Sequence, residues 1–147
     1  MSEHFRTPED YELFLYSLPD RFASIRGSTI TFIRLGTSLA RVAGELDFDH
    51  GIRLVARERL LYDRLPITID GYGYEVWQGK DKLYWYDAQP HPNDPNLQLT
   101  HPHHKHIPPD IKHNRIPARD ISFTQPNLPT LIREIEQMIR EIEGGLA

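Results

Sequence analysis

The residues best able to do chemistry are histidines gathered in one part of the chain. Six of the eight histidines lie between His91 and His113, within 23 residues. An imidazole exchanges a proton near neutral pH and also binds metal ions. If residues 103–106 run extended, their side chains alternate, with His104 and His106 on one side and the other two on the opposite side. We therefore expect the working site in this stretch, with one pair of side chains facing a cleft.

General acid–base catalysis is the chemistry that this residue mix favours most. Two imidazoles of different protonation can act on either side of a phosphodiester. The base would be His103 or His104, and the acid His106 or His91. A neighbouring cation such as Lys105 would stabilise the developing charge, and Asp87 would orient one imidazole. The candidate catalytic residues are Asp87, His91, His103, His104, Lys105 and His106.

A metal site is the second chemistry that the same residues allow. The chain has no cysteine, so its ligands would be imidazoles and carboxylates. The candidate ligands are Asp87, His91, His104 and His106, a set that suits zinc or manganese. Their spacing matches no established zinc pattern, and a metal-independent site without a cofactor is favoured. A third interpretation is that the histidines only decorate a proline-rich surface loop.

The charges around the cluster indicate an anionic ligand. Between residues 101 and 119, four cations accompany a single anion, Asp110. Arg57 and Tyr86 lie on predicted strands that lead to the same region, the first as a cation and the second as a stacking surface. The candidate substrate-binding residues are Arg57, Tyr86, Lys112 and Arg115.

The composition is that of an ordinary globular protein and sets limits on its class. The 147 residues suit one domain, residues 1–147, with 39% hydrophobic and 26% charged residues. No apolar run approaches the roughly 20 residues that cross a bilayer, and the first residues lack a signal-peptide pattern. We expect a cytoplasmic protein with no membrane association. The net charge of −4 argues against a protein that binds nucleic acids through a surface that is basic overall.

Two helices are predicted at the ends of the chain. Thr7 is a good N-cap, Pro8 suits the first helical position, and apolar residues follow at helical spacing until Pro19. Near the C-terminus, apolar residues between 128 and 142 recur every three or four positions, and Gly144-Gly145 ends the pattern.

The central part of the chain alternates with a period of two and predicts strands. Residues 39–48 and 52–61 flank Asp49-His50-Gly51, which is typical of a hairpin connection. Tyr72, Tyr74 and Val76 share one face of a strand, and further strands precede and follow. Residues 89–129 are rich in proline and predict an ordered functional loop. The expected fold is α+β: an N-terminal helix, a four- or five-stranded antiparallel sheet, the Pro/His-rich loop and a C-terminal amphipathic helix.

Three segments together resemble the TumE-like toxin family of prokaryotic toxin–antitoxin systems. They are Tyr72-Gly73-Tyr74-Glu75-Val76-Trp77, then Leu83-Tyr84-Trp85-Tyr86-Asp87 leading to Pro90-His91, and finally Thr100-His101-Pro102-His103-His104-Lys105-His106. The resemblance covers roughly residues 26–115. The chain departs from the family's pattern at Ala88-Gln89, at Pro92 and at His101.

The resemblance implies a small growth-inhibiting toxin with a cognate antitoxin. Its helix–sheet–helix outline is similar to that of the RelE/barnase-like ribonuclease toxins, which is an analogy of fold only. Together with the His/Lys/Asp cluster, it makes an endoribonuclease toxin acting on RNA or the ribosome our leading hypothesis, with a homodimer as one possible assembly. The alternatives are a metal-dependent hydrolase or nucleotidyl-transfer toxin, and a metal-binding regulatory or interaction module without catalysis.

Overall fold

The structure is a computed structural model that describes residues 3–88, 103–108, 115–118 and 120–145. The elements are η1 (Glu3–Phe5), α1 (Pro8–Tyr16), α2 (Leu18–Arg21), β1 (Gly27–Ser28), β2 (Thr31–Arg34), β3 (Leu39–Asp47), η2 (Asp49–Gly51), β4 (Ile52–Leu61), β5 (Thr68–Gln78), β6 (Asp81–Asp87), β7 (His104–His106), β8 (Arg115–Pro117) and α3 (Leu128–Gly145).

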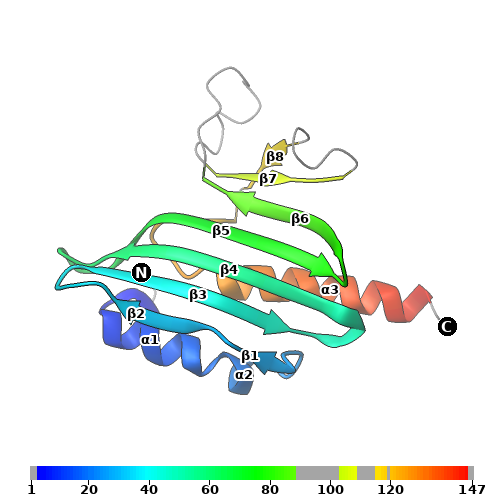
Figure 1. Cartoon of the computed structure of the whole chain (residues 1–147), viewed down its shortest axis with the longest axis horizontal. Helices are drawn as coiled ribbons and strands as arrows, with labels where there is room; N and C mark the ends of the chain where they lie inside the picture. The colour runs from blue at the N-terminus through cyan, green and yellow to red at the C-terminus, as the bar shows by residue number, and fades with distance from the viewer. Residues whose placement is uncertain (1–2, 89–102, 109–114, 119, 146–147) are drawn as a thin grey trace.

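The eight strands of the described residues all belong to one antiparallel sheet (Figure 1). Their order is β1-β3-β4-β5-β6-β7-β8, and β2 also pairs with β3. The short strands β1 and β2 pair with successive parts of β3, so they form one interrupted edge. Gly44 lies at the interruption, where a Cβ would come within 2.4 Å of the Thr29 carbonyl oxygen. Only glycine fits there.

The α+β class and the helices at both ends are confirmed, but the predicted number of four or five strands is too small. The difference lies mainly in the segment that the sequence assigned to a loop. His104–His106 pairs with β6, and Arg115–Pro117 pairs in turn with β7. The prolines of this region allow short strands at the edge of a sheet, where a missing N–H is tolerated.

The predicted start of the N-terminal helix is also confirmed. Thr7 is the N-cap of α1, and its hydroxyl accepts a hydrogen bond of 3.1 Å from the backbone N–H of Asp10. Pro8 takes the first helical position, where its missing N–H removes no helical bond. Pro19 does not end the helical region, because it lies in the first turn of the short helix α2.

Helices α1 and α3 cover the same face of the sheet. Tyr11 of α1 donates a hydrogen bond to Glu58 of β4, and Glu134 of α3 accepts one from Tyr86 of β6. Glu58 and Tyr86 share that face through the paired residues of β5 that lie between them. The buried residues of α3 are Leu128, Leu131, Ile132 and Ile135. None of the described helices is long and apolar enough to cross a membrane.

No described helix contacts the opposite face of the sheet, which we call the open face. It carries the side chains between those that face the helices, as strand alternation requires. Among them are arginines and tryptophans of β3, β4, β5 and β6: Arg41, Arg53, Arg57, Arg59, Trp77 and Trp85.

A buried polar network ties the helices to the middle of the sheet. Glu58 is 2% exposed and accepts hydrogen bonds from the hydroxyls of Tyr11, at 2.5 Å, and Tyr74. Asn127, just before α3, donates to the Tyr74 hydroxyl at 3.0 Å and to the Ser122 carbonyl. Burial raises the pKa of Glu58 above its ordinary value, although both tyrosine hydrogen bonds oppose the rise.

The raised pKa of Glu58 predicts a pH-dependent stability. Its contribution is fully present below the unfolded pKa of about 4.3 and is lost as the pH rises through the folded pKa. We expect the free energy of unfolding of the wild type to fall more steeply between pH 4 and pH 8 than that of Glu58→Gln. Urea unfolding at a series of pH values measures both slopes. Glu45→Gln, on β3, is the control and should keep the wild-type slope; equal slopes in all three proteins would contradict the prediction.

Candidate active site

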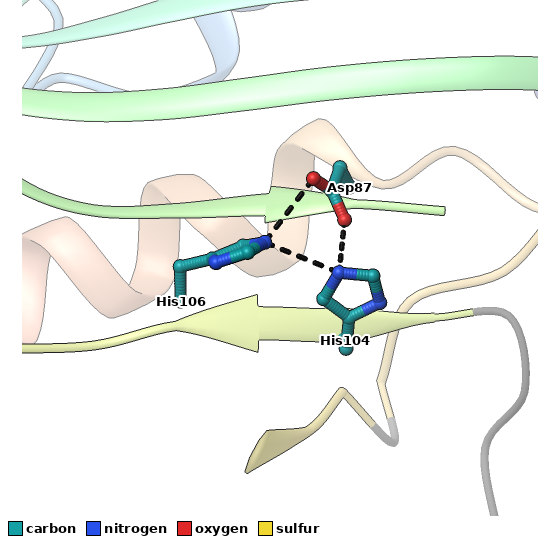
Figure 2. A group of neighbouring side chains, drawn as sticks. All are labelled: Asp87, His104 and His106. Atoms are coloured by element: carbon teal, nitrogen blue, oxygen red, sulfur yellow. Dashed lines mark hydrogen bonds and ion pairs between the residues drawn. The ribbon is translucent and has the colours of Figure 1, made fainter. Parts of the chain in front are cut away.

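The register between β6 and β7 brings the central histidines to Asp87. Asp87 lies opposite His104, and Trp85 lies opposite His106. Residues paired in this way project from the same face, and so do residues two apart on one strand. All four side chains therefore lie on the open face, and Figure 2 shows those of Asp87, His104 and His106 pointing toward one another from the two strands.

The three side chains converge on a small volume. The His104 Nε2 contacts Asp87 Oδ1, and the His106 Nε2 lies 3.2 Å from Asp87 Oδ2. The two Nε2 atoms are 3.1 Å apart. One atom from each residue fits within a 4.8 Å span. We call Asp87, His104 and His106 the triad.

The surroundings of the triad hold its members in place. His104 and His106 are 1% and 4% exposed, whereas the Asp87 side chain keeps 20% of its surface exposed. The Trp85 ring stacks on His106 with centroids 4.1 Å apart, and its N–H donates to Asp87 Oδ2 at 3.2 Å. Burial by itself would raise the pKa of Asp87, but the two imidazoles and the indole N–H outweigh it and lower that pKa. Asp87 is therefore a carboxylate at neutral pH.

A cavity of about 380 Å³ opens beside Asp87 on this face. Arg57, Gly73 and Asp87 form a row across three neighbouring strands, each opposite the next. Arg57 lies over Gly73, with its Nη2 only 3.1 Å from where a Cβ at residue 73 would be. The missing side chain leaves room for both the arginine and the cavity, which Trp85 also lines.

Comparison with known protein families decides the identity of the chain. The family model described as Toxin TumE matches residues 14–141, a range that contains the whole triad and both strands that carry it. The chain belongs to the TumE toxin family. No curated protein and no solved structure matches it. Membership implies the toxin component of a toxin–antitoxin system.

Within this TumE-family chain, Lys105 lies on the opposite face from the triad. Its Nζ is 3.3 Å from Glu134 Oε1 of α3 and 4.2 Å from the centre of the Tyr84 ring. Tyr86, the expected stacking residue, is buried on the same helix-covered face and donates its hydroxyl to Glu134 at 2.8 Å. The Lys105 ammonium and the Tyr86 hydroxyl therefore point away from the triad, although Tyr86 also contributes to the lining of the cavity.

His103 also faces away from the triad. The Tyr72 hydroxyl lies 2.6 Å from His103 Nδ1, and the two rings stack with centroids 5.6 Å apart. Phe123 packs against the same imidazole at 4.4 Å. The alternation predicted for residues 103–106 is therefore present, with His103 and Lys105 on the helix-covered face and the other two histidines on the open face.

The remaining candidates are placed only in part. His91 and Lys112 lie outside the described residues. The backbone of Arg115 lies on β8 opposite His106, and its side chain is not described. Two residues of the site, Gly73 and Trp85, were not among the catalytic and substrate-binding residues predicted from the sequence. Trp85 could have been found from its spacing, since it precedes Asp87 by two residues on a strand.

The contact between Tyr72 and His103 predicts an energetic coupling that holds the start of β7. A double-mutant cycle combines Tyr72→Phe with His103→Ala, and we expect a coupling free energy of about 1 kcal/mol, as for one buried hydrogen bond. Urea unfolding followed by tryptophan fluorescence measures it.

The matched control replaces Tyr72→Phe with Tyr16→Phe, at the opposite edge of the sheet. The Tyr16 hydroxyl accepts a hydrogen bond from the backbone N–H of Phe32, so its removal should be additive with His103→Ala. A coupling near zero for Tyr72 and His103 would contradict the prediction.

Proposed function

We propose that this TumE-family toxin is an endoribonuclease and that the triad is its reaction centre. The observation that carries the proposal is the convergence of two imidazole nitrogens and a carboxylate beside a cavity that also holds an arginine. Imidazole and carboxylate groups move protons at neutral pH, and a guanidinium binds phosphate through several N–H groups. A phosphodiester in this cavity would meet both kinds of group.

The short distance between the two Nε2 atoms limits how the histidines act. In-line cleavage places the attacking and leaving oxygens on opposite sides of phosphorus. Two nitrogens 3.1 Å apart lie on the same side of a bound phosphodiester, so His104 and His106 act as one unit rather than as separate base and acid. Charge stabilisation is assigned to Arg57 instead of Lys105, whose ammonium is held by Glu134 on the other face.

The open face supplies a second reason to choose RNA as the substrate. Arg57 and Trp85 line the cavity, and Arg59, which pairs with Asp70, lies two residues further along β4. Arginines bind the phosphate backbone, and an indole face can stack with a base. A cytoplasmic toxin held by its antitoxin until release fits such a substrate. His91 and Lys112 stay predictions for this site.

Replacing the triad should abolish both RNA cleavage and toxicity. We expect Asp87→Asn, His104→Ala and His106→Ala each to lower the cleavage rate about 100-fold or more, as for the loss of a general acid or base. Cleavage of a labelled single-stranded RNA and growth after induced expression measure the two effects.

The control for the triad variants is His50→Asn. His50 lies on η2 with φ 64, where asparagine is well tolerated, so this variant removes a remote histidine without backbone strain. It should stay fully active. Full toxicity of both histidine variants of the triad would contradict the proposal, and so would a folded wild-type protein that neither cleaves RNA nor inhibits growth.

Removing Arg57 should weaken turnover without unfolding the protein. Arg57 is exposed, and a charge-assisted contact to phosphate is worth about 1.5–3 kcal/mol, so we expect Arg57→Ala to lower kcat/KM about 10- to 100-fold. Arg41→Ala is the matched control, since Arg41 is also exposed on the open face but lies on β3, two strands from Gly73. Equal loss in both variants would argue against a specific role for Arg57.

A further inference from the structure

We propose that Asp87, His104 and His106 bind a single divalent metal ion of the zinc class. The binding itself can be tested without RNA; the use of the ion in cleavage rests on the proposed function, with both Nε2 atoms then acting as ligands in place of proton carriers. Two imidazoles and one carboxylate are a donor set that zinc accepts in catalytic sites, where three protein ligands leave a position for water or substrate. The same set also suits other first-row metals.

The arrangement of donors and acceptors favours an ion at the centre of the triad. Both Nε2 atoms face the Asp87 carboxylate and lie 3.1 Å from each other. If both nitrogens carry a proton, two N–H groups oppose each other at contact distance. If only one nitrogen carries a proton, it can donate to the other nitrogen or to the carboxylate, and one close contact between two acceptors remains. A cation between them turns all these lone pairs into ligands.

The carboxylate shows the same preference. Asp87 Oδ1 is buried, and His104 Nε2 lies directly against it. A metal ion between the two would pair with the buried negative charge of Asp87 and with the imidazole nitrogen at once.

The scaffold around the triad suits a metal site. Its two histidines lie on β7 and its carboxylate on β6, so strand pairing fixes all three ligands. The Trp85 N–H donates to Asp87 Oδ2, which is the kind of outer contact that orients metal-binding carboxylates. The exposed edge of Asp87 borders the cavity, so an ion there would be open to a phosphodiester oxygen and could polarise it as a Lewis acid. His91, the fourth ligand expected from the sequence, lies outside the described residues.

The test is a calorimetric titration of the EDTA-dialysed full chain with zinc chloride and, separately, with manganese chloride. We expect one equivalent of zinc to bind with a rise in the melting temperature. His104→Ala, His106→Ala and Asp87→Asn should lose this site, and His50→Asn should keep it. Circular dichroism verifies that each variant is folded.

A second measurement avoids variants altogether. Cobalt(II) bound to two imidazoles and a carboxylate should give visible d–d absorption that zinc abolishes by displacement. No binding of either ion by folded wild type, or unchanged zinc binding in both histidine variants, would overturn the metal site. Undiminished RNA cleavage by protein kept in EDTA would overturn its use in catalysis while leaving the endoribonuclease intact. Stoichiometric zinc binding without cleavage of any RNA would support the site and overturn the proposed function.

Discussion

In the antiparallel pairing of β6 with β7, Asp87 lies opposite His104 and Trp85 opposite His106. A shift of one residue would turn β7 over and bring His103 and Lys105 to the open face in place of the two histidines of the triad. The contacts on the covered face oppose that shift. Lys105 is held by Glu134 and the neighbouring tyrosine rings, and His103 by Tyr72. The residues expected to be catalytic thus lie on two faces of the sheet. Lys105 and His103, on the covered face, fix the strand register that positions the triad on the open face.

The position of β5 depends in turn on the buried network around Glu58. This carboxyl joins α1 to β5 through Tyr11 and Tyr74, and Asn127 extends the contact to the start of α3. The ring of Tyr74 stacks on that of Tyr72 with centroids 5.0 Å apart, and Tyr72 reaches His103. A buried polar network needs every partner in place, so it specifies one arrangement of helices and strands more strictly than apolar packing does. The triad lies at the outer end of this chain of contacts.

Local patterns predicted much of this structure, because they depend on neighbours in sequence. The cap at Thr7, the hairpin of β3 and β4, the apolar stripe of α3 and the alternation of residues 103–106 are all of this kind. The pairing of β7 with β6 is not, since sixteen residues separate Asp87 from His104. Strand alternation also predicts that Lys105 and His104 lie on opposite faces of the sheet. It does not predict which of the two faces α3 covers. Predicting the contact between the two Nε2 atoms requires knowledge of both the strand register and the side-chain geometry.

The two faces of the sheet carry different charges, which changes how the acidic net charge of the chain should be understood. On the covered side, acidic residues of α3 are engaged by the protein itself: Glu134 by Lys105, Glu136 by Ser24 and Glu143 by His50. On the open face, Arg41, Arg57 and Arg59 are exposed within a few strands of the triad. Polyanion binding responds to the phosphates contacted locally and not to the total charge of the protein. A net charge of −4 for the whole chain is therefore compatible with a phosphate-binding face, which we propose is the face onto which the triad opens.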